Sequence, residues 1–304
     1  MAAAGFGTLG ALSRFAADAG LSTIAFVTWR SLMGATILAA AILGAAAIGR
    51  VRLVAPRDVP RQHWLQVMSV ACMSLLTNLA VFAAFERTTI ALVLIAFYTY
   101  PVLVAVAAVR VYGDPLTLGR VVALAMASAG MVLVVVAPAL DEGGVQVDPL
   151  GLVLGLAASA FQTVYALIAG RGYPSLPAAQ AATAIAAAAA LGLVLITVVS
   201  GSVSDLLEPL STDGAWMPIV LAATVGLAIP TAAVIAGYRR VGPTSASILM
   251  LFEPVVGVLL AALLVSERPS PLQLVGGLLV LGGGALVHVG RPAPRGLGEG
   301  VPSV

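Results

Sequence analysis

Uninterrupted apolar runs of about 20 residues constrain the fold of this chain more than any other feature. The segments 90–109 and 178–199 contain no charged residue. A helix that crosses a bilayer needs about 20 such residues, whereas a membrane strand alternates apolar and polar side chains. The composition agrees, because 61% of residues are hydrophobic and 9% are charged, against about 25% charged in soluble domains. The sequence therefore predicts an all-α polytopic membrane protein, and it excludes a soluble domain and a disordered chain.

Ten transmembrane helices are predicted from the apolar runs and the breakers between them. The connecting segments carry Pro, Gly and charged residues, which are typical of loops. The predicted spans are 2–17, 21–46, 64–85, 90–112, 117–138, 150–169, 178–199, 216–238, 244–265 and 271–289.

The positions of the arginines predict the orientation. Cytoplasmic loops of membrane proteins carry an excess of Lys and Arg, and this chain has Arg but no Lys. Three arginines fall on one side of the ten spans, namely Arg14, Arg87 and Arg268. The other side holds Arg50, Arg52, Arg57, Arg61, Arg110, Arg120, Arg171, Arg239, Arg240, Arg291 and Arg295. We therefore expect a multi-pass protein of the inner (plasma) membrane with both termini in the cytoplasm.

An internal repeat relates residue n to residue n + 153. Without a gap, Arg87 aligns with Arg240, Pro101-Val102 with Pro254-Val255, and Gly130 with Gly283. The repeat pairs spans 4 and 5 with spans 9 and 10, which indicates two five-helix units. Because five is odd, the second unit enters the membrane inverted, a construction that recurs in secondary transporters.

Two motifs resemble the EamA repeats of the drug/metabolite transporter superfamily. The segment Phe97–Val104, followed by Gly113–Thr117, is similar to the first repeat. The segment Leu251–Val256, followed by Ser266-Glu267-Arg268 and the glycines of span 10, resembles the second. The resemblance implies a first repeat over 1–138, a second over 150–289 and a cytoplasmic tail over 290–304. It also implies a carrier of small metabolites, often amino acids, that commonly works as an exporter.

The candidate site lies where prolines interrupt spans. Pro101 and Pro254 fall in the middle of spans 4 and 9, and Pro230 is interior to span 8. A proline inside a helix frees the carbonyl four residues earlier, here that of Phe97 or Met250. Broken helices at the midplane are where carriers bind solutes. The alternative is a packing kink, which membrane helices tolerate.

Glu253 is the only acidic residue deep inside a predicted span. A carboxylate at mid-bilayer costs several kcal/mol unless it is protonated, paired or hydrated. Its functional interpretation is contact with a substrate ammonium group, or proton coupling. The structural alternative is a protonated carboxyl that hydrogen-bonds a neighbouring helix. The repeat places Tyr100 opposite Glu253.

Other polar residues at depth are weaker candidates for the lining of a cavity. Tyr98 and Tyr100 are two residues apart, so on one continuous helix they would diverge by about 200° and could not both face one cavity; Tyr98 is preferred slightly. For each candidate the alternative is an interhelical hydrogen bond, worth about 0.6 kcal/mol on average. Arg30, inside span 2, would either bind an anion, extend toward water, or pair with Asp18. The remaining candidates are Asn78, Gln162, Tyr165, Ser159, Thr231, Ser245 and Ser247.

Several kinds of chemistry find no support in the sequence. Two histidines and one cysteine offer no metal-ligand cluster. The chain has no lysine and therefore no phosphate-binding loop of the Gly-Lys-Ser/Thr type, and no basic run points to nucleic acid. We expect a carrier that uses no metal or cofactor and moves a small organic solute. The sequence leaves open whether protons drive the transport and whether span 10 forms a homodimer contact. A channel-like or structural membrane protein is the first rival interpretation, and a membrane-embedded enzyme the second.

Overall fold

The computed structural model describes residues 1–113, 116–141, 147–173, 175–264 and 269–289, and these residues form helices without a β-strand. The elements are α1 (Ala2–Asp18), α2 (Thr23–Ala47), η1 (Pro56–Asp58), α3 (Arg61–Phe85), α4 (Ile90–Phe97), α5 (Tyr100–Tyr112), α6 (Leu118–Asp141), α7 (Pro149–Arg171), α8 (Ala178–Val199), η2 (Ser202–Leu207), α9 (Glu208–Ser211), α10 (Trp216–Ala223), the π-helical turn η3 (Thr224–Ala228), α11 (Ile229–Val241), α12 (Pro243–Met250), α13 (Phe252–Leu264) and α14 (Pro271–Val289).

Eight helical stretches of the described chain are long and apolar enough to cross a membrane. They are Thr23–Ala47, Arg61–Phe85, Ile90–Tyr112, Leu118–Ala137, Pro149–Arg171, Ala178–Val199, Trp216–Val241 and Pro243–Leu263. The apolar stretch of α14, Pro271–Val287, is shorter, and α1 has 17 residues. The protein is thus a multi-span helical membrane protein. Three stretches predicted as single helices are interrupted, between α4 and α5, at η3, and between α12 and α13.

Local sequence signals explain many of the helix ends. Pro149, Pro243 and Pro271 each stand in the first turn of a helix, where the missing N–H costs no hydrogen bond. The Asp148 side chain caps α7 by accepting a hydrogen bond from the Leu150 N–H at 2.8 Å. At the start of α14, Gln273 Oε1 accepts from the Ser270 N–H at 2.9 Å, and Ser270 Oγ accepts from the Gln273 N–H at 3.3 Å. This pair is a capping box.

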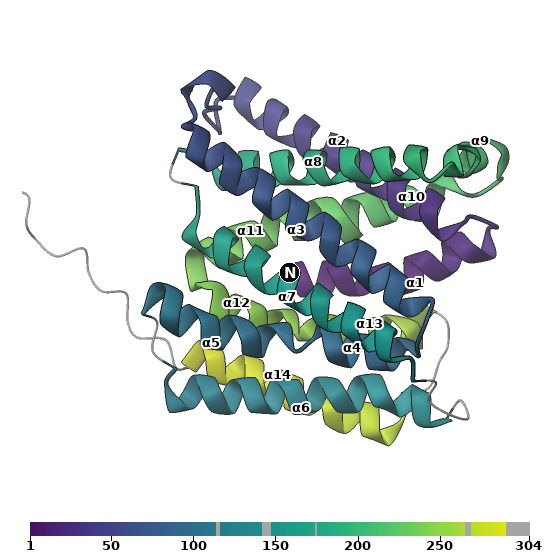
Figure 1. Ribbon diagram of the computed structural model, residues 1–304, viewed down its shortest axis with the longest axis vertical. Coiled ribbons are helices and arrows are strands. Elements are labelled where there is room, and N and C mark those ends of the chain that lie inside the picture. The colour runs from purple at the N-terminus through teal and green to yellow at the C-terminus, as the bar shows by residue number, and fades with distance from the viewer. Residues whose placement is uncertain (114–115, 142–146, 174, 265–268, 290–304) are drawn as a thin grey trace, which may run out of the picture.

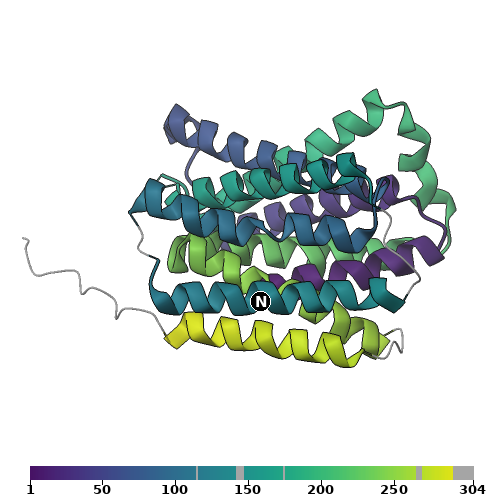
Figure 2. The same cartoon turned by 60° about the horizontal axis from the view of Figure 1, so that its bottom comes forward.

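Helices distant in sequence form the main contacts. The α6 and α14 helices lie side by side along one edge of the molecule, and α2 packs on α8 at the opposite edge (Figures 1 and 2). Between these edges, α3 packs against α7, and α1 against α13. Many side chains on the outer surface are apolar, for example Leu278 and Leu191. Such a surface is what the hydrocarbon of a bilayer requires.

Small residues bring α6 and α14 into backbone contact. A Cβ atom on Gly130 would lie 2.4 Å from the Gly276 carbonyl oxygen, and one on Gly276 would lie 2.5 Å from the Gly130 carbonyl oxygen. A Cβ atom on Gly283 would lie 2.6 Å from the Ala123 carbonyl oxygen. Close backbone approach through small residues is typical of helix pairs in membranes. The glycines of span 10 therefore pack within the chain.

This contact predicts opposite effects for two adjacent alanine substitutions. Alanine is favoured over glycine in a helix by about 1 kcal/mol, and this gain is the same at Gly276 and Gly277. At Gly276 the added methyl meets backbone and overpacks the contact, at a cost of about 1–3 kcal/mol. At Gly277 the nearest neighbour, Val255 Cγ1, is 3.6 Å from the added Cβ. We expect G276A to lower the Tm of detergent-solubilised protein and G277A to leave it unchanged or raise it. Equal Tm values for the two variants would contradict the close packing.

Candidate functional site

Two helix breaks meet in the interior of the molecule. The first lies at Tyr98–Thr99, between α4 and α5, and the second at Leu251, between α12 and α13. The helices before them end at Phe97 and Met250, and Pro101 and Pro254 both stand in the first turn of the next helix. Helix α12 packs against α5, and Tyr98, Tyr100 and Leu251 belong to one buried cluster.

A polar contact holds the first break against α7. Thr99 Oγ1 donates to the Ala96 carbonyl oxygen at 2.7 Å, and it lies 2.8 Å from Ser159 Oγ. Ser159 is fully buried on α7. The backbone of the break is therefore satisfied partly by side chains, as hydrocarbon surroundings require.

Three aromatic rings surround this break. The Phe97 ring centroid lies 5.2 Å from that of Tyr98 and 5.3 Å from that of Tyr100, and the two tyrosine rings are 6.5 Å apart. Both tyrosines are buried, and both hydroxyls lie within electrostatic range of the Glu253 carboxyl. The prediction that Tyr98 and Tyr100 diverge is wrong, because it assumed a continuous helix where the chain breaks between them.

The aromatic cluster continues toward α7 and α11. Tyr100 lies near Tyr165 and Tyr238, whose ring centroids are 6.1 Å apart in an edge-on arrangement. The Tyr238 hydroxyl approaches the Gln162 side chain but makes no hydrogen bond with a described residue. Gln162 and Tyr165 of α7 thus both lie near Tyr238, and Ser159 of the same helix contacts Thr99. Sequence reasoning missed Tyr238, which was assigned to the end of a span, where tyrosines commonly mark the membrane interface.

A fifth tyrosine, Tyr173, extends the cluster into the segment between α7 and α8. It is fully buried, and its hydroxyl has no hydrogen-bond partner in the described chain. Burial raises the pKa of Tyr173 above its ordinary value, although nearby Arg239 acts in the opposite direction. Its neutral hydroxyl is a donor without an acceptor. Leu176, whose carbonyl oxygen accepts from Arg239 Nη1 at 3.3 Å, is buried beside this segment. No local pattern in the sequence indicates that this loop enters the core.

Neither of the two charged candidates inside spans has a counter-ion among the described residues. Glu253, partly buried at the start of α13, makes no hydrogen bond or ion pair with a described residue. Arg30 is 8% exposed, its Nε has no partner, and its guanidinium carbon lies 5.7 Å from the centre of the Phe26 ring. The structure does not pair Arg30 with Asp18, which is exposed. In a membrane an ionisable group of this kind marks a functional site by default.

The remaining predicted residues are not brought to the tyrosines by any described interaction. Asn78 is partly buried and donates to the Ser74 carbonyl oxygen of its own helix at 2.8 Å. Thr231 is partly buried on α11, next to Pro230 and just after η3. Ser245 and Ser247 are buried in α12, where Ser247 Oγ donates to the Thr244 carbonyl oxygen at 2.9 Å. Parts of the predicted motifs and the predicted tail lie outside the described residues, namely Asp114, Pro115, Ser266, Glu267, Arg268 and residues 290–304.

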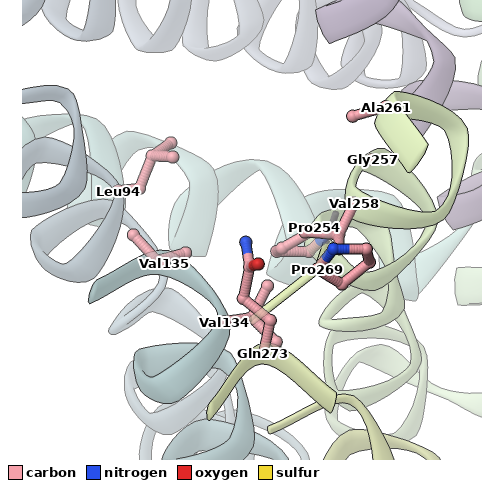
Figure 3. A pocket seen from close by; sticks show the side chains of 9 residues that line it. All are labelled: Leu94, Val134, Val135, Pro254, Gly257, Val258, Ala261, Pro269 and Gln273. Atoms are coloured by element: carbon pink, nitrogen blue, oxygen red, sulfur yellow. The ribbon is translucent and has the colours of Figure 1, made fainter. Parts of the chain in front are cut away.

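A cavity of about 240 Å³ lies beside the second break (Figure 3). Helices α4, α6, α13 and α14 line it with mostly apolar side chains, including Leu94, Val135 and Pro254. The Gln273 amide points into the space between Val135 and Pro254 (Figure 3), although its oxygen also caps α14. Leu94 lies one turn before Tyr98, and Pro254 follows Glu253, so the cavity ends next to the aromatic cluster. The described residues contain no group of three or more metal-ligating side chains.

Comparisons with known proteins agree with this architecture. The sequence profile of the EamA-like transporter family matches residues 1–136 and 149–289, nearly the whole chain. The chain belongs to the EamA-like transporter family. A protein of known crystal structure shares its fold with a TM-score of 0.72 over 95% of both chains, at 18% sequence identity. Among curated proteins no sequence matches. As an EamA-like protein, the chain is a membrane-embedded, multi-pass relative of transporters.

Two tyrosine-to-phenylalanine substitutions in this EamA-like protein should differ in stability. The Tyr238 hydroxyl is buried and has no hydrogen-bond partner among the described residues, so Y238F should leave the Tm unchanged or raise it. The Tyr112 hydroxyl donates to the Leu167 carbonyl oxygen, so Y112F should cost about 0.5–1.5 kcal/mol and lower the Tm. Thermal unfolding in detergent measures both. A Tm loss for Y238F as large as that for Y112F would show that the Tyr238 hydroxyl has a structural partner.

Proposed function

We propose that this EamA-like protein is a ten-span carrier that moves a small organic solute by alternating access between two inverted five-helix repeats. Glycine contacts support the repeat. Gly130 contacts Gly276. In the repeat, Gly130 corresponds to Gly283 and Gly276 corresponds to Ala123, and Gly283 contacts Ala123. Both contacts are present, as an approximate two-fold relation between the halves requires.

Other helix contacts also occur in pairs that the repeat relates to each other. Helix α1 packs on α13, and its counterpart α7 packs on α4 and α5. Helix α3 packs on α7, and its counterparts α10 and α11 pack on α1. The two breaks also correspond, because Tyr98 and Leu251 are 153 residues apart. Two related halves of this kind can rock about a site between them. The proposal counts α1 and α14 as the first and tenth spans.

The proposed membrane is the inner membrane, with both termini in the cytoplasm, as the arginine distribution predicts. Cysteine labelling tests this topology. In a background that carries Cys72→Ser, S204C lies in the predicted outer segment and L53C in the predicted inner one, and both positions are exposed. A membrane-impermeant maleimide should label S204C in intact cells and L53C only after permeabilisation. The reverse labelling pattern would overturn the orientation.

The paired helix breaks beside Glu253 are the observation that carries the proposal. We assign substrate contact to Glu253, Tyr98, Tyr100, Gln162 and Tyr165 and add Tyr238, since these residues adjoin the breaks or the tyrosine cluster. Asn78 and Thr231 are lining residues on the flanks. An amino acid is the first substrate class to test, because inside the spans one acid and one base make no ion pair with a described residue. Neutral aromatic solutes come second, given the tyrosines. Export is the direction that the family likeness favours.

The family membership favours a carrier over a membrane enzyme. The clustering of polar side chains at the breaks favours a carrier over a channel, which would need a continuous polar path. Gly276 and Gly283 pack on α6, so they are not available for a homodimer contact. A homodimer through α14 would use its exposed leucines, Leu274, Leu278 and Leu281.

Counterflow of labelled amino acids in proteoliposomes tests both transport and proton coupling. The wild type should exchange a solute at a rate that changes between about pH 5.5 and 8, where a buried carboxyl can titrate. E253Q, which cannot release a proton, should lose that pH dependence. E86Q changes an exposed acid of the α3–α4 loop and is the matched control. Equal transport by E253Q and wild type at every pH would leave Glu253 structural. Failure of well-folded protein to exchange any amino acid would move the search to other organic solutes.

A further inference from the structure

A second cavity of about 330 Å³ lies away from the tyrosine cluster, between α3, α5 and α7. Leu65, Gln66 and Ser69 line it from α3, Val111 and Tyr112 from α5, and Val164, Leu167, Ile168 and Arg171 from α7. Leu65 is 58% exposed, and Val111 and Val164 are each about 40% exposed. The cavity is therefore a groove that opens sideways onto the surface that faces hydrocarbon.

The polar groups of this groove gather at one end. Helix α3 begins at Arg61, α5 ends at Tyr112 and α7 ends at Arg171, so the three helix ends lie at one membrane face. Arg171 makes no ion pair with a described residue, and its guanidinium carbon lies 5.7 Å from the centre of the Tyr112 ring. The Tyr112 hydroxyl is held by the Leu167 carbonyl oxygen, which fixes the ring beneath the guanidinium. Arg61 stands one turn before Leu65 on the same side of α3.

We propose that this groove binds one anionic glycerophospholipid, phosphatidylglycerol being the headgroup we expect, with its phosphate at Arg171 and one acyl chain along Leu65, Ser69 and Val164. This apolar groove opens to hydrocarbon, where a water molecule would lack hydrogen-bond partners. An acyl chain therefore suits the groove better than water does. At the mouth, the Arg171 guanidinium, which makes no ion pair with a described residue, attracts a phosphate that carries a net charge. Basic pockets between spans at the cytoplasmic side are known to bind anionic headgroups.

The side chain of Gln66 adds a second polar residue to this groove. Gln66 lines the groove, and its side-chain oxygen has no hydrogen-bond donor among the described residues. This oxygen is closed to a water-sized group, so the preference for an anionic headgroup rests on the charge of Arg171. This proposal rests on the proposed topology for its choice of leaflet, but not on transport.

The single cysteine provides a native reporter. Cys72 is exposed and follows Ser69 by three residues, so it continues the groove side of α3. At 1.5 Å per residue it lies about 16 Å along α3 from Arg61, near the middle of an acyl chain. The full-length protein is labelled with bimane at Cys72 and reconstituted in vesicles. The vesicles contain dibrominated phosphatidylglycerol or dibrominated phosphatidylcholine at equal mole fraction, and quenching of the bimane fluorescence is measured.

We expect the apparent affinity for the phosphatidylglycerol quencher to exceed that for the phosphatidylcholine quencher about fivefold, the effect of one arginine near the surface. R171Q should reduce this ratio to about one. R50Q removes the same charge from an exposed residue on the same side and should keep the ratio. V164F fills the groove from a lipid-facing position and should weaken quenching while Arg171 is intact.

Three results would overturn the site. Equal quenching by the two lipids in wild type would mean ordinary annular lipid. Loss of the ratio in R50Q as large as in R171Q would mean general attraction to a basic surface. Quenching by the phosphatidylglycerol quencher that is as strong in V164F as in wild type would place the lipid elsewhere. None of these results bears on counterflow, so the lipid site and the carrier proposal fail separately.

Discussion

The lack of water inside a bilayer is the constraint on which the rest of the structure depends. Every backbone N–H and C=O in the hydrocarbon needs a partner within the protein, so an interruption of a helix there requires compensation. This chain interrupts helices at Tyr98–Thr99 and at Leu251, and it buries both interruptions against other helices. At the first, the Thr99 hydroxyl supplies a hydrogen bond to the Ala96 carbonyl and meets Ser159 of α7. The broken segments therefore stay inside the protein, away from lipid.

Close packing of small residues makes this burial geometrically feasible. Gly155 of α7 approaches α4 so closely that a Cβ atom would lie 2.9 Å from Ala96 Cβ. Gly7 of α1 lies against the second break, where a Cβ atom would meet the Glu253 carbonyl oxygen at 2.8 Å. Each break is thus covered by a glycine-bearing helix from the other half of the chain. These glycines therefore determine the distance between the packed helices of the two halves.

The sequence predicted a multi-span, all-helical chain, but it predicted neither all the helix breaks nor every residue of the candidate site. Apolar length and proline positions are local signals, so the ends of α4 at Phe97 and of α12 at Met250 could be anticipated from Pro101 and Pro254. The relative direction of Tyr98 and Tyr100 could not, because it depends on how sharply the chain turns at the break. Tyr238 and Tyr173 were missed because their burial arises from contacts between distant segments. Gln273 was missed because its place beside the cavity follows from the packing of α14 on α6.

The charges inside the spans argue for a site that is completed by something other than the protein. If Glu253 and Arg30 had paired with each other or with neighbours, both would be structural, since a buried pair satisfies its own charges. The described structure pairs neither, and it leaves the hydroxyls of Tyr173 and Tyr238 without acceptors. Unpaired charge and unsatisfied hydroxyls in low dielectric carry a free-energy cost that folding alone does not recover. A bound solute, a proton on Glu253, or water admitted with the solute would each lower that cost, and a carrier needs groups whose best partner arrives and leaves.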